Sequence, residues 1–185
     1  MSKGYDINRI AQLVQKNERI FHTKDLALLW KIKNSNTLHV TISRYCSKKI
    51  LFRIYKGLYS LIPVSQLDPF LVGIKAIHQY AYVSTETILF QFGFFPQLAP
   101  YISLISPVSK KIRIEKWWFR SRKLKDEFLY NPEGIYEKDG VKFATLERAV
   151  ADMLYFNPHY YIDSFQQLNW AKIKKLQKKL NYVSA

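Results

Sequence analysis

The sequence predicts an α+β fold in two parts, residues 1–64 and residues 65–185, joined at a polar segment that contains Asp68-Pro69. In the first part, three segments with helical spacing of apolar residues precede two short β-type runs joined at a glycine. In the second part helices and strands are interspersed, which is typical of a mixed or antiparallel sheet. Because 48% of the 185 residues are hydrophobic, the chain can build a core and disorder is not expected.

The first two predicted helices are short. Residues 7–16 (INRIAQLVQK) carry apolar side chains at helical spacing, and residues 23–32 (TKDLALLWKI) repeat the pattern after a short extended stretch. Thr23 offers a hydroxyl that can cap the second helix. Asp25 places a negative charge in the first turn of that helix, where the helix dipole favours it.

A third helix is predicted over residues 35–49, with Leu38, Ile42 and Tyr45 on the face that packs. Its N-terminal end offers backbone N–H groups that attract phosphate. The opposite face and its flanks carry polar or basic side chains and one valine that could meet a thymine methyl, as a DNA-recognition helix requires. These candidate contacts are Ser35, Asn36, Thr37, His39, Val40, Ser43, Arg44 and Lys48, with Ser47 on the same face.

Two β-type runs follow, residues 51–55 and residues 58–62, and Lys56-Gly57 forms the turn between them. Arg53 and Lys56 are placed to reach the DNA backbone from this hairpin. Three short helices followed by a hairpin is the order of elements in a winged helix-turn-helix domain. The first part of the chain is therefore predicted to bind double-stranded DNA.

The distribution of charge agrees with this prediction. The formal net charge is +15, and residues 1–60 carry +9 of it, from 12 basic and 3 acidic side chains. Such an excess indicates an anionic partner, and contacts to phosphate would make the binding constant fall with salt. Two other interpretations of this part remain open: a small helical domain with a solvated basic face, and a protein-docking module.

The helices predicted in the second part are marked by capping residues or by a proline at the start. They cover residues 69–80 after Asp68, 84–92 with Ser84 as the cap and Glu86 in the first turn, 146–156 after Thr145, and 169–180. Arg148 and Asp152 stand four residues apart and predict a structural ion pair. In the last helix, which is basic and amphipathic, Ile173, Leu176 and Leu180 are expected to face inward.

Strands are predicted over residues 101–108 and 111–122, followed by a hairpin over 134–145 that turns at Asp139-Gly140. The strand after residue 110 can form a second basic surface that binds nucleic acid, with Trp117 or Trp118 available to stack on a base. The alternative is an ordinary strand with one solvated face, because alternation places lysine and arginine opposite isoleucine. The candidate residues of this surface are Lys110, Lys111, Arg113, Lys116 and Arg120.

Catalytic, metal and cofactor sites are not predicted. The four histidines are scattered, the glycines form no phosphate-binding loop, and no hydrolase, metalloprotease or paired-carboxylate nuclease motif is present. The single cysteine, Cys46, follows the packed Tyr45 and is interpreted as a small core residue. No apolar run approaches the roughly 18–20 residues that span a bilayer, and the start of the chain lacks a signal peptide. We therefore expect a cytoplasmic protein with no enzymatic activity and no membrane partner.

Several segments resemble the AbiEi-type antitoxin family. The run Ile54-Tyr55-Lys56-Gly57-Leu58-Tyr59 is similar to the wing of that family, which has a basic residue, a glycine and then an aliphatic–tyrosine pair. The resemblance continues through YVSTETILFQFGF, YISLISP and GIYEKDGVKFATLERAVADMLYFNP, and covers about residues 18 to 180. One departure lies just before the wing, where glycine is common in the family and this chain has Lys49-Ile50.

The resemblance implies an antitoxin of a bacterial abortive-infection toxin–antitoxin pair. Its first domain would bind repeats in its own promoter and repress the operon, and its second would counteract an AbiEii-type toxin with a nucleotidyltransferase fold. Direct contact with the toxin is left open. A single winged helix reads few bases, so an inverted repeat bound by a weak dimer or by two monomers is expected. The alternative is an interaction module that neutralises a toxin by direct binding, without a DNA role.

Overall fold

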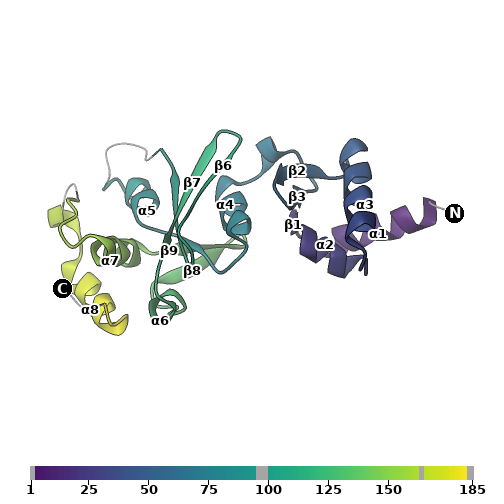
Figure 1. Cartoon of the computed structure of the whole chain (residues 1–185). Helices are drawn as coiled ribbons and strands as arrows, with labels where there is room; N and C mark the ends of the chain where they lie inside the picture. Colours follow the sequence, from purple (N-terminus) through teal and green to yellow (C-terminus); the bar gives the residue numbers. More distant parts are fainter. Residues whose placement is uncertain (1–2, 95–99, 163–164, 183–185) are drawn as a thin grey trace. The chain divides into compact units, whose positions relative to one another are not determined.

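The computed structural model describes residues 3–94, 100–162 and 165–182 of the chain. The chain folds into two compact units, Met1–Asp68 (unit 1) and Pro69–Ala185 (unit 2). Both units combine helices with a sheet, which confirms the predicted α+β class (Figure 1).

Unit 1 combines helices with a three-stranded antiparallel sheet in the order β1-β3-β2. Along the chain its elements are α1 (Lys3–Gln15), β1 (Ile20–His22), α2 (Thr23–Leu29), α3 (Ser35–Ser47), β2 (Phe52–Tyr55), β3 (Leu58–Ser60) and the short 3-10 helix η1 (Val64–Gln66). The extended stretch predicted before α2 is thus β1, an edge strand that pairs with β3 of the hairpin.

The core of unit 1 holds α3 in one orientation. Its predicted packing face is confirmed, because Leu38, Ile42 and Tyr45 are buried. The ring of Trp30 meets the ring of Tyr45 edge-on with centroids 5.4 Å apart, and its indole N–H donates to the carbonyl oxygen of Arg9 at 3.3 Å. With one face packed in this way, the opposite face of α3 is turned to solvent.

The start of α2 differs from the prediction. The N-cap is His22 and not Thr23: the His22 ring accepts from the Lys24 N–H, and Asp25 accepts from the His22 N–H at 2.9 Å. The Thr23 N–H and hydroxyl instead donate to the carbonyl oxygen of Gly57 at 2.9 and 3.1 Å. A hydroxyl that is bound to the hairpin turn cannot cap its own helix.

Two helices of unit 1 end earlier than predicted, and for the same reason. After α2, Lys31 adopts a left-handed φ of 54°, and the chain folds back so that the Ile32 N–H donates to the carbonyl oxygen of Ala27 at 3.0 Å. After α3, Lys49 adopts a φ of 56° and the Ile50 N–H donates to the carbonyl oxygen of Tyr45. Left-handed residues of this kind satisfy the last carbonyl groups and stop a helix.

Unit 2 is built on a six-stranded mixed sheet in the order β6-β7-β5-β4-β9-β8, in which β5–β7 and β4–β9 are parallel pairs. Its elements are α4 (Pro69–Ile77), β4 (Tyr82–Val83), α5 (Glu86–Gln91), β5 (Ile102–Ser106), β6 (Lys110–Ile114), β7 (Trp117–Lys123), α6 (Asp126–Leu129), β8 (Ile135–Lys138), β9 (Val141–Ala144), α7 (Leu146–Phe156), η2 (Phe165–Gln167) and α8 (Trp170–Lys179). The sequence does not predict β4 and α6, which are too short to show a period. It also predicts residues 111–122 as one strand, whereas this segment forms two antiparallel strands, β6 and β7, because the chain turns back after Ile114 at Glu115, which has a left-handed φ of 49°.

Helices cover both faces of this sheet. In Figure 1, α4 lies against one face and α5 and α7 against the other, and α8 packs on α7. The predicted inward face of α8 is confirmed by the burial of Ile173, Leu176 and Leu180. On the opposite side, Gly73 of α4 sits so close to Phe119 of β7 that a Cβ atom would lie 2.6 Å from the ring. These helices leave β8 and one face of the β6–β7 hairpin exposed to solvent.

The cap predicted for α5 is wrong, whereas the cap predicted for α7 is confirmed. Thr85, and not Ser84, is the residue before α5, with a φ of 50°. The Ser84 hydroxyl is buried and donates to Asp152 of α7 at 2.8 Å. Thr145 accepts from the Arg148 N–H as predicted, and Asp139-Gly140 forms the predicted two-residue turn with both φ angles positive.

The predicted ion pair of α7 is confirmed and is fully buried. Arg148 Nε donates to Asp152 Oδ1 at 2.9 Å, and the Tyr82, Ser84 and Tyr182 hydroxyls donate to the two carboxylate oxygens at 2.5 to 3.0 Å. The other guanidinium N–H groups donate to the Tyr82 hydroxyl and to three backbone carbonyl oxygens, those of Phe128, Asn131 and Glu133. We call these side chains the buried network of unit 2. Burial and the Asp152 carboxylate raise the pKa of Tyr82 and of Tyr182 above its ordinary value.

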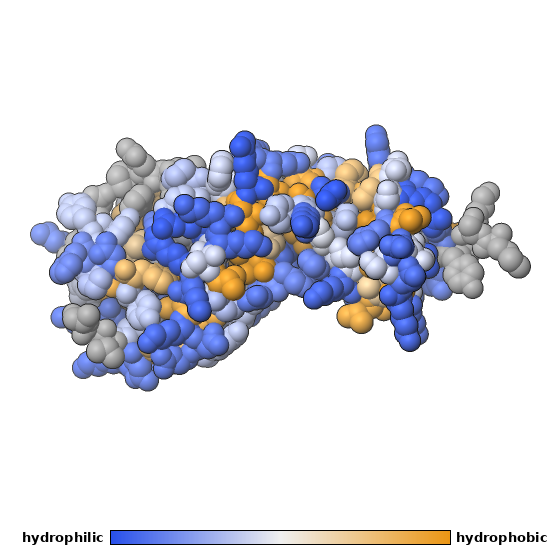
Figure 2. Space-filling model, viewed as in Figure 1, coloured by the Kyte–Doolittle hydropathy of each residue, from blue (hydrophilic) through white to orange (hydrophobic). Residues whose placement is uncertain are grey.

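Within the described residues, no helix combines the length and the apolar character that crossing a membrane requires. Figure 2 shows that the visible surface is largely hydrophilic, with smaller hydrophobic patches.

Candidate nucleic-acid interface

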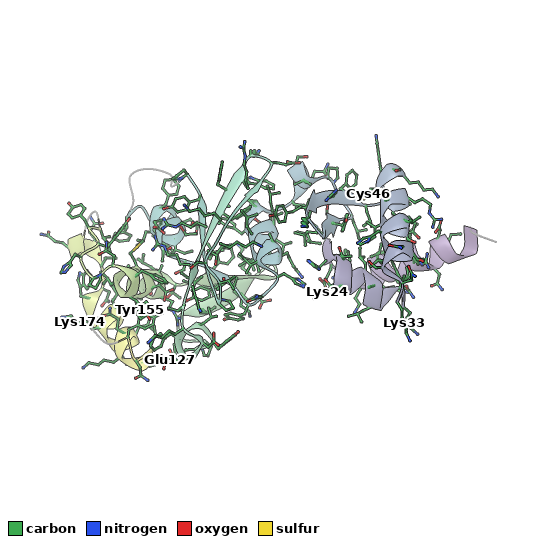
Figure 3. The ribbon with its side chains drawn as sticks, viewed as in Figure 1. Lys24, Lys33, Cys46, Glu127, Tyr155 and Lys174 are labelled. Carbon is green, nitrogen blue, oxygen red and sulfur yellow. The ribbon has the colours of Figure 1, made fainter. Side chains whose placement is uncertain are left out.

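The start of α3 is held by a local cap. Asn34 Oδ1 accepts from the Thr37 N–H at 3.0 Å and lies 3.4 Å from the Thr37 hydroxyl. Ser35 and Asn36 therefore form the first turn, and Lys33 lies just before it, as Figure 3 shows. The polar turn ahead of α3 thus brings a cation and a helix N-terminus together, the combination that favours an anion.

The outward face of α3 presents the side chains that the sequence selects. Val40 is the most apolar of them and is 67% exposed. Because it is exposed, this valine adds nothing to the core of unit 1. The residues beside it that pack inward are Leu38 and Thr41. The exposed candidates on this helix and just after it are Ser35, Asn36, Thr37, His39, Val40, Ser43, Arg44, Ser47 and Lys48.

Two of the candidate cations are paired with an acidic residue of α1. Arg44 Nη2 lies 2.7 Å from Asp6 Oδ1, and Lys48 Nζ lies 3.6 Å from Asp6 Oδ2. The Tyr45 hydroxyl donates to Asp6 at 2.9 Å, and this bond, with the two cations, lowers the pKa of Asp6 below its ordinary value. Asp6 therefore stays ionised at neutral pH and offsets positive charge at this end of α3. The sequence does not predict this contact.

The hairpin places two further cations. Arg53 and Lys56 are exposed, and neither forms an ion pair with any residue that the structure describes. Gly57 follows with a φ of 74°, so the turn uses the conformation that favours glycine. Because the carbonyl oxygen of Gly57 accepts two bonds from Thr23, the turn is tied to the start of α2. The position of Lys56 is thereby set by two elements of the unit.

The candidate contacts selected from the sequence leave out two exposed lysines at the ends of α3, Lys33 and Lys49. Lys33 precedes the Asn34 cap, and Lys49 follows the helix in a left-handed conformation. The signal that could have indicated them is their position directly beside the helix ends. In the sequence, Lys33 precedes α3, and Lys49, Arg53 and Lys56 follow it.

The second basic surface lies on the β6–β7 hairpin of unit 2. Ile112 and Ile114 are buried while Lys111 and Arg113 are exposed, which confirms the predicted alternation. Lys110 and Lys116 are exposed as well. Arg120 differs, because it is partly buried and its guanidinium donates to the Tyr101 hydroxyl at 2.9 Å.

The described residues hold no group of three or more histidine, cysteine, aspartate or glutamate side chains that could bind a metal ion. Cys46 is partly buried and packs against the core of unit 1, near the end of α3 (Figure 3). Burial raises the pKa of the Cys46 thiol, whereas a reactive cysteine has a lowered one.

Comparison with known proteins adds information on the fold. No protein-family model and no curated protein matches the chain. Among solved structures, the crystal structure of the RV2827C protein from Mycobacterium tuberculosis is similar, with a TM-score of 0.51 and 10% sequence identity. The similarity covers 96% of this chain and 67% of that chain. At so low an identity it shows a shared fold alone.

Proposed function

We propose that unit 1 is a winged-helix domain that binds double-stranded DNA, with α3 as the recognition helix and the β2–β3 hairpin as the wing. The observation that carries the proposal is the outward face of α3, which is polar except for the exposed Val40 while its other face is packed in the core. The 13 residues of α3 span about 20 Å, and a helix of this size enters the major groove of B-form DNA.

The chemistry of this face suits both kinds of DNA contact. Asn36, His39 and Arg44 carry groups that bond to base edges, and the exposed methyl groups of Val40 can meet a thymine methyl. The N-terminus of α3, Lys33, and the wing cations supply contacts to phosphate. The excess of basic residues in this part of the chain raises the rate of encounter with DNA and makes the affinity depend on salt.

We further propose that the protein is an antitoxin that represses its own toxin–antitoxin operon in the bacterial cytoplasm. The support is the resemblance of the wing and of the segments of unit 2 to AbiEi-type antitoxins. The partner is then a nucleotidyltransferase-like toxin encoded by a neighbouring gene. Expression of that toxin with and without this protein tests antitoxicity, and co-purification of the two separates direct neutralisation from an indirect effect.

The variant Arg53→Ala/Lys56→Ala tests the role of the wing. Each side chain lost removes about one phosphate contact, so the slope of log affinity against log salt is expected to become shallower by about 2. At moderate salt the affinity for the protein's own upstream DNA should fall by about 10- to 100-fold. Fluorescence anisotropy of a labelled duplex, titrated at several salt concentrations, measures both quantities.

The matched control is Lys174→Ala/Lys175→Ala, which removes the same charge from exposed positions on α8 of unit 2. This variant should retain most of the affinity and its salt slope. Equal losses of DNA affinity in the two double variants would show that only net charge matters and would contradict a role of the wing in DNA binding. No binding of the unmodified protein at low salt would contradict the DNA proposal itself.

Asp6→Asn is expected to tighten DNA binding by about 2- to 10-fold and to steepen the salt slope by about 1. The asparagine keeps an acceptor for the Tyr45 hydroxyl but releases Arg44 and Lys48 from their shared carboxylate. The same anisotropy titration measures the change, with Asp126→Asn on unit 2 as the charge-matched control. Weaker binding of Asp6→Asn would mean that Asp6 orients the two cations for DNA instead of competing for them.

A further inference from the structure

We propose that the β6–β7 hairpin of unit 2 binds unpaired nucleotides of a single-stranded nucleic acid, by stacking bases on Trp118 and Tyr101 and by pairing phosphates with the basic residues around them. We call this surface the aromatic–basic face. It is formed by Tyr101, Lys111, Arg113, Trp118 and Arg120, with Lys116 at the hairpin turn. The inference concerns unit 2 and does not rest on the DNA-binding role of unit 1.

Strand register brings these residues to one face. Arg113 of β6 lies opposite Trp118 of β7, and Lys111 lies opposite Arg120. Partners across a ladder share a face, and residues two apart on one strand share it as well, so the four side chains form one patch. The isoleucines between them are buried on the other face, which α4 covers. The patch is thus a solvent-facing surface of the sheet edge.

Each arginine of the patch lies over an aromatic ring. The Arg113 guanidinium lies 5.0 Å from the centroid of the Trp118 ring, and the Arg120 guanidinium lies 5.3 Å from that of Tyr101. The hydrogen bond from Arg120 to the Tyr101 hydroxyl at 2.9 Å fixes the second pair. A planar ring that is held in place offers a base a surface for stacking. The guanidinium group beside it can pair with the phosphate of the same strand.

The surface is hollowed beside these rings. One hollow of about 340 Å³ is lined by Tyr101, Trp117 and Trp118, among others, and a second of about 260 Å³ by Tyr101, Lys111, Trp118 and Arg120. Pro100, Tyr101 and Trp118 line both, so the two hollows adjoin at these residues. Trp118 is nonetheless 49% exposed. Hollows of this size accept a small planar group such as a base.

The charge of the hairpin identifies the occupant. Among residues 110–123 there are seven basic side chains and one acidic side chain, Glu115. One of the seven, Arg122, is already paired with Glu86. A purely apolar ligand would leave the other cations without an ionic partner, whereas a nucleic acid strand supplies a phosphate for each base. Duplex DNA offers phosphates, but its bases are stacked on one another and their faces are inaccessible to Trp118. The combination of rings and cations therefore favours an unpaired strand.

The test uses the full chain and a fluorescein-labelled oligonucleotide of about 12 nucleotides without self-complementarity, made once as RNA and once as DNA. Trp118→Ala is expected to weaken binding by about 10-fold, and Trp118→Phe, which keeps a ring, to retain most of the affinity. Lys111→Ala/Lys116→Ala should make the salt slope shallower by about 1.4, as expected for two phosphate contacts to a single strand. Binding to the RNA oligonucleotide alone would identify the ligand as RNA. Equal binding of the two oligonucleotides would show that the protein does not distinguish ribose from deoxyribose.

Two controls separate this surface from the rest of the protein. The wing variant Arg53→Ala/Lys56→Ala should keep its affinity for the single strand, and Trp118→Ala should keep its affinity for the upstream duplex and its thermal unfolding temperature. Equal binding by Trp118→Ala and the unmodified protein would overturn the proposal and leave only non-specific attraction. Failure to bind either strand at low salt would also overturn it and would favour an acidic protein as the partner of this face.

Discussion

Replacing Asp152 with alanine is expected to destabilise unit 2 by about 3–5 kcal/mol, the cost of leaving a buried charge without its partner. Arg148 and Asp152 are both fully buried, so water cannot take the place of the lost carboxylate. The alanine also leaves the hydroxyls of Tyr82, Ser84 and Tyr182 without their acceptor. Since a domain is stable by about 5–15 kcal/mol in total, this loss is a large fraction of the whole.

The measurement must report unit 2 by itself, because a chain with two units need not unfold in one step. Hydrogen exchange resolved by peptides, read at α7 with α3 of unit 1 as the internal reference, gives the local free energy of opening. Glu137→Ala is the matched control, since it breaks an ion pair of the same length, 2.9 Å, between exposed side chains. It should cost no more than about 1 kcal/mol. Similar losses of stability in Asp152→Ala and Glu137→Ala would show that burial does not make the Arg148–Asp152 pair more important for stability than an exposed pair.

A double variant distinguishes the two roles of Arg148. In Arg148→Met/Asp152→Leu the buried charge is gone, but three carbonyl oxygens of the segment 128–133 lose the donors that Arg148 supplies. The carbonyl oxygen of Phe128 keeps the Asn131 N–H at 3.4 Å, whereas those of Asn131 and Glu133 are left without this donor. Each unsatisfied carbonyl group costs about 1–3 kcal/mol, so the double variant should remain less stable than the unmodified protein. A double variant of unchanged stability would show that the guanidinium serves only to neutralise Asp152.

Gly134→Ala is the second substitution with a large expected effect, a loss of about 2–5 kcal/mol. Gly134 has a φ of 74°, which costs any other residue about 1–2 kcal/mol. Its added Cβ would lie 2.8 Å from Arg148 Cβ, and Arg148 cannot shift without disturbing the buried network. Forcing an atom into such a packed position costs about 1–3 kcal/mol more. Hydrogen exchange at α7 again reports the loss.

Gly140→Ala separates the two contributions. Gly140 has nearly the same φ, 75°, but a Cβ there meets no atom within 4 Å. This variant should therefore show the backbone cost alone, about 1–2 kcal/mol. If both glycine variants lose the same stability, the contact with Arg148 is not a packing constraint.

Local patterns account for much of what the sequence predicts correctly. The packed face of α3, the Thr145 cap and the Asp139-Gly140 turn each depend on residues within a few positions of one another. The alternation that buries Ile112 beside an exposed Lys111 is equally local. Such features follow from the period of a helix or strand and from the conformations that a turn demands. They suffice for the α+β class and for the exposed candidates of α3.

Long-range partners decide the rest. The Ser84 hydroxyl meets Asp152 across 68 positions, and the Thr23 hydroxyl meets Gly57 across 34, so neither is available as the predicted helix cap. Asp6 neutralises part of the charge on α3 from 38 positions away. By itself the sequence determined the α+β class, most of the longer elements and the packed face of α3, because these follow from local spacing. Only the tertiary structure decided which polar groups meet. A hydroxyl or a carboxylate bonds to whichever partner the packing of distant elements brings within reach.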